Sequence, residues 1–449
     1  IGVREAHLIN GATIPTLTVG ADPNAQAGGQ ITVHGLQGAK IMADSVTLSG
    51  FGSGIKTDAG GFGQSGAIAL SAKTISLTDG AVIQAGSPGA SGAGGAVTLN
   101  AASVDISGGS SIASQASEAP AGQVTITANE FTLDNGAITT STSSSLTRSP
   151  GGNVVLDVGT GSLSNGATIN SSTTGTGRAG DIKMNVGSLT LANHSEITNS
   201  SSGTMANAGD AGTITTTGNR VSLASGSSIT SATTGAGNAG QVIITTPALS
   251  LNDATITTST SSTGNAGGIT ANVGTLTLTN AAEIASSSTG AATGAAGSVT
   301  IQGLASPANS VTLMNSSLRT SADSTGRGGS ITVDATNVTL NGATISASVK
   351  DVNTAEVTDG PTSGIGNITL TSSTTYMTGG TVTAATSGTR NAGTITMTTT
   401  GNTVSLAGGS SITSATTGAG NAGQVILTTP ALSLNDATIT TSTSSTGNA

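Results

Sequence analysis

The stretch Ser330-Ile331-Thr332-Val333-Asp334-Ala335-Thr336-Asn337-Val338-Thr339-Leu340-Asn341-Gly342-Ala343-Thr344-Ile345-Ser346-Ala347-Ser348 decides the fold. Apolar and polar residues alternate in three short runs, which are 331–335, 338–340 and 343–347. A period of two predicts β-strands with one buried face, and the many β-branched residues suit a pleated surface. The Asn-Gly pair at 341–342 predicts a tight turn before the third run.

This pattern recurs along the whole chain. The residues that open the first run of each copy are Ile31, Ile68, Val97, Val124, Val154, Ile182, Ile214, Val242, Ile269, Val299, Ile331, Ile368, Ile395 and Val425. From 31 to 425 is 394 residues over 13 steps, and such a period indicates a repeat architecture. We therefore predict an all-β, right-handed parallel β-helix (β-solenoid) of about 14 coils of roughly 30 residues, with three short strands per coil. At about 4.8 Å per coil, the stack would be on the order of 70 Å long.

Two columns of residues are expected to hold the coils together. The inward column of the third run consists of Ile169, Ile197, Ile229, Ile256, Ile284, Ile345 and Ile439, each followed two residues later by a small or short polar residue. The turn before the third run carries an Asn column: Asn10, Asn135, Asn165, Asn193, Asn252, Asn280, Asn315, Asn341 and Asn435. Asn tolerates the left-handed backbone of a tight corner. Stacked Asn side chains can also form an amide ladder, and the sequence leaves both interpretations open.

The organisation expected from these repeats is a single continuous β-solenoid over residues 1–449, taken from a longer repeat array. Residues 221–266 match residues 404–449, and the offset in numbering, 404 − 221 = 183, equals six coils. The two copies differ only at Ser225 against Gly408 and at Ile244 against Leu427, which suggests duplication of a six-coil block. Two repeats of 37 residues predict loop excursions at 50–66 and 349–366, where binding is plausible because excursions from a rigid scaffold often carry function.

Composition limits the possible partners. The chain has no cysteine and no tryptophan, only 7% charged residues, and a formal net charge of −9. Disulfides and cysteine-based metal sites are therefore excluded. Lys and Arg occur singly rather than in patches, so we expect no nucleic-acid partner. No apolar run is long enough to cross a bilayer, so we expect no membrane insertion in this segment.

Catalytic and metal sites are not expected either, and we predict no cofactor. A β-helix enzyme would need carboxylates or basic groups gathered on one face, whereas the acidic residues fall at different places in successive repeats: Asp105, Asp134, Asp157, Asp181 and Asp210. The histidines, His7, His34 and His194, are isolated. Tandem Gly-Gly-x-Gly-x-Asp motifs of calcium-binding β-rolls are missing. An outward Thr column on the third run is interrupted too often for an ice-binding face, so solvated strands are the better interpretation.

The repeats, such as the quoted block 330–348, resemble those of filamentous-haemagglutinin-like exoproteins, large bacterial surface proteins often exported by two-partner secretion. The resemblance covers nearly the whole chain and implies a right-handed β-helix used as an adhesive or projecting fibre. We therefore expect a non-enzymatic extracellular rod, the stalk segment of a large bacterial surface adhesin that attaches to a host, cell-surface or polysaccharide ligand. One alternative is a self-assembling filament or sheath subunit whose copies associate end to end or side by side. A carbohydrate-active β-helix enzyme is a further alternative.

Overall fold

A computed structural model describes residues 1–20, 28–38, 41–61, 63–86, 91–144, 149–290, 293–305, 307–323, 326–350, 366–387, 389–444 and 447–448. The chain divides into two compact units. Unit 1 comprises residues 1–219 and 226–228, and unit 2 comprises residues 220–225 and 229–449. Each unit is treated separately below, and the prediction of one continuous solenoid through both stays a prediction.

All regular structure in the described residues is β-strand. The first fifteen strands lie in unit 1: β1 (Glu5–Ile9), β2 (Thr13–Gly20), β3 (Ile31–Val33), β4 (Ala43–Ser49), β5 (Gly54–Gly61), β6 (Ile68–Thr78), β7 (Val82–Gly86), β8 (Val97–Ser107), β9 (Ser111–Ala116), β10 (Val124–Asp134), β11 (Ala137–Thr142), β12 (Val154–Ser164), β13 (Thr168–Thr173), β14 (Ile182–Leu191) and β15 (Glu196–Ser201). Strands β16 (Ile214–Ala224) and β17 (Ser228–Thr233) contribute residues to both units.

The remaining strands lie in unit 2. They are β18 (Val242–Asn252), β19 (Thr255–Thr260), β20 (Ile269–Thr279), β21 (Glu283–Ser288), β22 (Val299–Gln302), β23 (Ala308–Met314), β24 (Ser317–Ala322), β25 (Ile331–Asn341), β26 (Thr344–Val349), β27 (Ile368–Thr378), β28 (Thr381–Thr386), β29 (Ile395–Thr399), β30 (Val404–Thr416), β31 (Val425–Thr428) and β32 (Leu432–Thr443).

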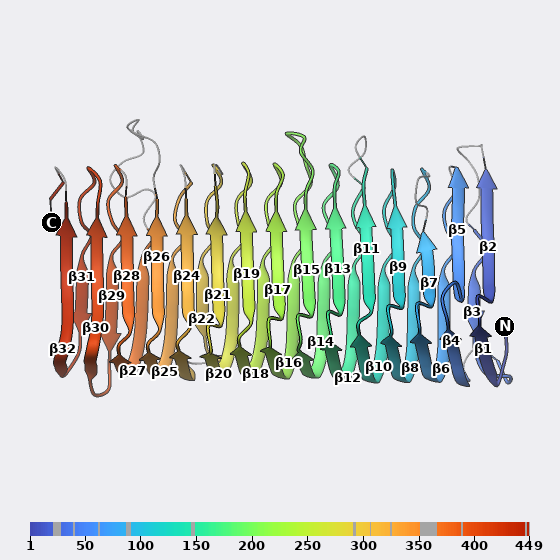
Figure 1. Cartoon of the computed structure of the whole chain (residues 1–449), viewed down its shortest axis with the longest axis horizontal. Helices are drawn as coiled ribbons and strands as arrows, with labels where there is room; N and C mark the ends of the chain where they lie inside the picture. The colour runs from blue at the N-terminus through green and yellow to red at the C-terminus, as the bar shows by residue number, and fades with distance from the viewer. Residues whose placement is uncertain are drawn as a thin grey trace. The chain divides into compact units, whose positions relative to one another are not determined.

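In each unit the strands stack in parallel as successive turns of a β-solenoid (Figure 1), which confirms the predicted fold class. In unit 1, Ile138 of β11 pairs with Ile112 of β9 and Ile169 of β13, and Ile169 pairs with Ile197 of β15. Unit 2 has an equivalent column, which pairs residue by residue through Ile256, Ile284, Leu318, Ile345, Val382, Ile412 and Ile439. The two units together contain about 13 turns at a spacing of roughly 29 residues, because fourteen anchors are separated by thirteen intervals.

The three predicted runs are present, but the first two are continuous in most coils. β10 shows the reason: its residues alternate between buried and exposed until Asn129 and Glu130, which are both exposed, and the alternation then resumes at Phe131. The chain turns a corner at this pair while its parallel partner β12 stays paired on both sides of it. The corner therefore bends one long strand instead of separating two.

The predicted loop excursion at 50–66 is wrong over residues 54–61. Residues 54–61 form β5, which pairs with β2 and β7 and places Ile55 in the core. The additional residues of this repeat lie earlier, because the chain segment from Ile31 to Val46 is more than twice as long as the segment that joins their partners, Ile68 and Ile75. The insertion is at 34–42, between the first and second runs. Phe62 lies outside the described residues.

The second excursion, predicted at 349–366, falls largely outside the described residues, which resume at Gly366. Its first residue, Val349, is instead the last residue of β26 and is buried.

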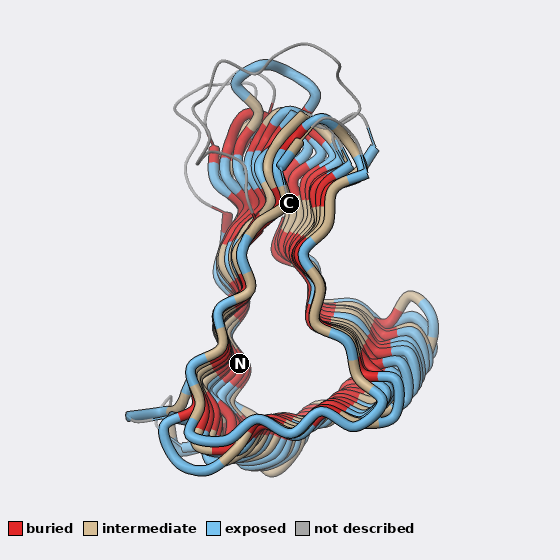
Figure 2. The backbone as a smooth tube through the Cα atoms, turned by 90° about the vertical axis from the view of Figure 1, so that its left-hand side faces the viewer, coloured by how far each residue is buried: buried red, intermediate tan, exposed pale blue. Residues whose placement is uncertain are grey.

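The core of each unit consists of stacked columns, and buried residues line the inner side of the chain (Figure 2). Six residues of the inward Ile column have no exposed surface: Ile169, Ile197, Ile229, Ile256, Ile284 and Ile345. Ile439 is half-buried, because β32 pairs with β30 on one side only. Burial of each of these isoleucine side chains stabilises the fold by about 1.5–3 kcal/mol. Most of the burial is provided by the neighbouring coils, as expected for a solenoid.

The Asn column combines both interpretations that the sequence left open. Six members adopt a positive φ themselves: Asn10, Asn135, Asn165, Asn193, Asn280 and Asn315. At Asn252, Asn341 and Asn435 the following residue has the positive φ. The amide ladder occurs as short segments, in which Asn193 Nδ2 donates to Asn165 Oδ1 at 3.0 Å and Asn280 Nδ2 donates to Asn252 Oδ1 at 2.6 Å. The same turn explains one difference between the duplicated segments, since Ser225 and Gly408 both have a positive φ there.

Candidate functional site

The Gly-rich connection after each third strand contains a glycine column, which was not predicted. Its members stand two residues before each first-run anchor: Gly29, Gly66, Gly95, Gly122, Gly152, Gly180, Gly212, Gly240, Gly267, Gly297, Gly329, Gly366, Gly393 and Gly423. A Cβ on Gly152 would lie closer than 3.0 Å to the carbonyl oxygen of Gly122, and one on Gly180 would meet Gly152 in the same way. Glycine is required here because the backbones of adjacent coils approach too closely for any side chain.

The inward small residue of the third strand bonds to this column. Threonines at this position donate to the glycine of their own coil. Thr140 Oγ1 donates to the Gly152 carbonyl at 2.6 Å, and Thr320 Oγ1 donates to the Gly329 carbonyl at 2.7 Å. Thr57 and Thr258 make the equivalent bond with Gly66 and Gly267.

Serines at the same position instead bridge two coils. Ser286 Oγ donates to Gly267 of the preceding connection at 3.0 Å and accepts from the N–H of Gly297 in its own connection at 2.8 Å. Ser114 does the same between Gly95 and Gly122, at 2.9 and 2.8 Å. These hydroxyls are fully buried, so the bonds satisfy backbone groups that water cannot reach. Thr140 and Thr320 therefore act within a coil and Ser286 and Ser114 act between coils, while Ser231 accepts from the N–H of Gly240 in its own coil at 2.8 Å.

Asn199 extends the bridging pattern with an amide. Its Nδ2 donates to the Gly180 carbonyl and its Oδ1 accepts from the Gly212 N–H, both at 2.6 Å. The sequence shows a small or short polar residue two positions after each Ile of the inward column. The signal that was missed is that the residue and the glycine recur together.

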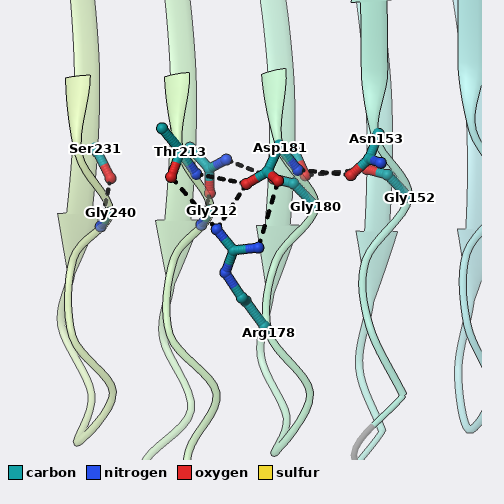
Figure 3. A network of polar contacts seen from close by, with 11 residues as sticks. Gly152, Asn153, Arg178, Gly180, Asp181, Gly212, Thr213, Ser231 and Gly240 are labelled. Atoms are coloured by element: carbon teal, nitrogen blue, oxygen red, sulfur yellow. Dashed lines mark hydrogen bonds and ion pairs between the residues drawn. The ribbon is translucent and has the colours of Figure 1, made fainter. Parts of the chain in front are cut away.

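A second, more exposed ladder runs beside the glycine column. Asn153 Oδ1 accepts from the N–H of Asp181 at 2.8 Å, and Asp181 Oδ1 accepts from the N–H of Thr213 at 2.8 Å (Figure 3). Arg178 joins it: its guanidinium donates to Asp181 Oδ1 at 2.7 Å, to Asp181 Oδ2 at 3.4 Å and to Thr213 Oγ1 at 3.4 Å. Two of these contacts hold the guanidinium against a single carboxylate, which fixes its plane.

A cavity of about 370 Å³ lies over this network, on three successive connections of unit 1. It is lined by Pro150, Thr176, Arg178, Asn207, Ala208, Gly209 and Asp210. The connection at 202–213 is the longest of the three, since the repeat from Ile182 to Ile214 is longer than either of the two repeats before it. Its additional residues form one wall of the cavity.

The outward side of β11, β13 and β15 carries three rows of hydroxyl and amide side chains, which we call the hydroxyl face. Ser141, Ser172 and Ser200 form one row through paired positions, and the adjacent rows contain Thr139, Asn170, Thr198, Ser143, Thr174 and Ser202. A shallow groove of about 250 Å³ crosses it, lined in part by Gln115, Ser141 and Ser172. Two members of the predicted outward Thr column, Thr139 and Thr198, are part of this face.

Charged groups are few and lie mainly at coil corners. Asp44 accepts from Lys73 Nζ at 2.6 Å and from Arg4 Nε at 3.1 Å, and these hydrogen bonds, that from Lys73 first, lower the pKa of Asp44. Burial raises the pKa of Asp58. Burial, with a smaller effect from the Asp134 charge, raises the pKa of Asp105. Asp105 and Asp134 occupy different positions in successive repeats, since Asp105 pairs with Thr132 and Asp134 pairs with Ser107, but they are close enough to interact.

The predicted histidines are not brought together. His7 lies 3.5 Å from Glu5, and His34 Nδ1 lies 2.8 Å from the Gly35 carbonyl. Within the described ranges, no group of three or more His, Asp or Glu side chains could hold a metal ion. No helix that could span a membrane occurs in the same ranges.

Comparison with known proteins gives no match: no protein-family model, curated protein or solved structure is similar to this chain.

Proposed function

We propose that this chain is a non-enzymatic structural segment of a large bacterial surface protein, the stalk of an adhesin or fibre that mediates attachment. We also propose that the chain belongs to the filamentous-haemagglutinin-like family that its repeats resemble, and that it is located outside the cell. The observation that carries it is the bridging of adjacent coils, as Ser286 does between Gly267 and Gly297.

Bridging of this kind supports a stalk because it couples each coil to its neighbours only. Stability in such arrays is approximately a sum of repeat and nearest-neighbour terms, so coils can be added without a change in the rest. The segments 221–266 and 404–449 fit this logic, since the same sequence recurs six coils further along the chain with two differences. An active site, in contrast, ties function to a fixed set of coils.

The outward surface also suits a stalk. The hydroxyl face carries Ser, Thr and Asn where an enzyme cleft would need carboxylates within reach of a substrate. Such a neutral, hydrated surface suits an extracellular position and offers polar contacts along its length.

Localisation and attachment can be tested together. Antibodies raised against the purified chain should label intact, unpermeabilised cells of the source organism, and deletion of the segment that encodes residues 154–449 should shorten surface projections and reduce attachment. Labelling only after permeabilisation would contradict the proposal. Sedimentation of the purified chain separates the alternatives: a stalk segment should not grow with concentration, whereas a filament subunit should polymerise.

A further inference from the structure

Asn-Gly pairs occur at the turn before the third strand in four coils: Asn10-Gly11, Asn135-Gly136, Asn165-Gly166 and Asn341-Gly342. All four asparagines are exposed. We propose that Asn135 is a site of spontaneous deamidation in the folded chain, and that the other three asparagines are protected from it. The inference goes beyond the attachment role and does not depend on it.

The reaction uses the backbone nitrogen that follows the asparagine, and water is its only co-reactant. The glycine nitrogen gives its proton to the solvent and forms a bond with Cγ of the asparagine side chain. The bond between Cγ and Nδ2 then breaks, and Nδ2 leaves as ammonia with a proton from the solvent. Water opens the resulting cyclic imide at either carbonyl group, which gives aspartate or isoaspartate. Glycine in the second position favours ring closure because it has no side chain in the way.

Hydrogen bonds occupy the attacking nitrogen in three of the four turns. These bonds run to the following coil and join the N–H of Gly11 to Ser53 Oγ at 3.0 Å, that of Gly166 to the Asn193 carbonyl at 2.8 Å, and that of Gly342 to the Thr378 carbonyl at 2.9 Å. Each bond must break before the nitrogen can reach Cγ. It should therefore slow deamidation by about fivefold or more.

The turn at Asn135 differs because it is one residue shorter. Two residues separate Asp134 from Ala137, whereas three residues separate their paired partners in the next coil. Gly136 is buried, and its N–H makes no hydrogen bond with any residue that the structure describes. The Asn135 side-chain amide is likewise without a hydrogen bond in the described part of the chain.

An unpaired, buried N–H makes the closed form of this turn less stable. Burial of a backbone donor without an acceptor costs free energy, and that cost disappears when the turn opens and water solvates the Gly136 nitrogen. In the open turn the nitrogen can lose its proton and approach the exposed Asn135 side chain. The shortening of the turn therefore removes the protection that the longer turns have.

Deamidation would place a new carboxylate next to Asp134. Oδ1 of Asp134 already accepts from Ser164 Oγ at 2.9 Å, and the charge of Asp134 is a smaller cause, after burial, of the raised pKa of Asp105. The reaction would therefore concentrate negative charge at one corner of unit 1. Where the product is isoaspartate, the main chain of the turn would also be longer by one carbon atom.

The test is to age the purified full chain at mildly alkaline pH for several weeks and to follow each Asn-Gly pair by peptide mass spectrometry. A parallel sample in concentrated urea gives the rates in the unfolded chain, which should be similar for all four pairs. The ratio of the unfolded rate to the folded rate measures the protection of each turn. For Asn135 this ratio should be at least about fivefold smaller than for Asn10, Asn165 or Asn341. Equal protection of the four asparagines, or faster loss of any of the other three, would overturn the inference.

Two variants test the cause of the difference. Ser53→Ala removes the acceptor of the Gly11 N–H, so deamidation of Asn10 should become faster while that of Asn165 stays unchanged as the internal control. Gly136→Ala introduces the side chain found before the equivalent strand of the next coil. It should slow the loss of Asn135, because a Cβ hinders ring closure.

Circular dichroism and the unfolding midpoint confirm that both variants are folded. The inference is wrong if Asn10 stays as protected in folded Ser53→Ala as in the unaltered chain, or if Asn135 is lost as fast in Gly136→Ala. Failure of cell-surface labelling would contradict the attachment role without affecting these rates, so the two proposals fail separately.

Discussion

Asn199 donates a buried hydrogen bond of 2.6 Å to the carbonyl oxygen of Gly180, one connection before its own. Its Oδ1 accepts from the N–H of Gly212, also at 2.6 Å, so one amide joins two turns of the solenoid. The other bridging positions use a serine hydroxyl for the same task, as in Ser286. The bridge therefore does not need an amide, because a serine hydroxyl at the same position can also form it.

Replacing the Asn199 amide should weaken the contact between the two coils locally. In Asn199→Ala, the Gly180 carbonyl and the Gly212 N–H lose their buried partner, at a cost of about 1–3 kcal/mol for each group. Asn199→Ser should restore part of the loss, because serine bridges at the equivalent positions. Hydrogen exchange of the Gly212 amide measures this directly, since repeat arrays do not always unfold in one step. Equal exchange in Asn199→Ala and in the unaltered chain would contradict the bridging role, and Ser200→Ala, on the outward face, serves as control.

The glycine column makes a second prediction, with a matched pair of adjacent residues. A Cβ on Gly267 would lie closer than 3.0 Å to the Gly240 carbonyl oxygen, whereas at Gly268 the nearest atom is 3.3 Å away. Gly267→Ala should destabilise unit 2 by about 1–3 kcal/mol, because the backbones would have to separate. Gly268→Ala should be neutral or stabilise by about 0.4–1 kcal/mol, since a residue with fewer unfolded conformations replaces glycine.

Thermal unfolding midpoints of Gly267→Ala and Gly268→Ala test this prediction, because only Gly267→Ala should lower the midpoint. Other coils already carry larger side chains at the position of Gly268, such as Gln241 and Ser298, which supports its use as the control. The explanation of the glycine column is wrong if both substitutions have the same effect.

The inward column gives a third prediction, again with both sites in one coil. Ile256 of β19 has no exposed surface, whereas Ile243 of β18 is on the outward side and half-exposed. Ile256→Ala should cost about 2–5 kcal/mol, because the substitution leaves a cavity between Ile284 and the preceding coil. Ile243→Ala should change stability by less than about 0.5 kcal/mol. Urea unfolding of both variants measures the difference, and similar midpoints would show that vertical stacking is not what stabilises the coils.

How far the sequence could predict this molecule depends on whether a feature is local. Alternation and spacing are local, so the anchors and the inward Ile column could be located from residue patterns alone. The insertion at 34–42 could not, because the distance from Ile31 to Ile68 gives the length of a repeat but not the place where residues were added. The glycine column could not be recognised from residue type alone, because glycine is common in any turn. The cavity over Arg178 depends on three connections of different length, which no single repeat encodes.

The ion cluster around Asp44 gives the last prediction, on pH. Arg4, Asp44 and Lys73 come from three successive coils, because β1 pairs with β4 and β4 pairs with β6. Since these partners lower the pKa of Asp44 below its ordinary value of 3.8, the folded chain binds the proton less tightly than the unfolded chain does. The stabilisation is therefore complete above about pH 3.8 and is lost as the pH falls through the lower, folded-state pKa.

An NMR titration of the Asp44 carboxyl group tests this cluster directly. The pKa should rise towards its ordinary value in Lys73→Gln and, by a smaller amount, in Arg4→Gln, because the hydrogen bond from Lys73 is the larger cause. Salt should produce the same rise, since the groups are exposed and screened by ions. Asp44→Asn is the control for stability, because the variant should lack the loss of stability at low pH that comes from this carboxyl group. If Asp44 titrates at its ordinary value in the unaltered chain, the three side chains do not tie the first three coils together in solution.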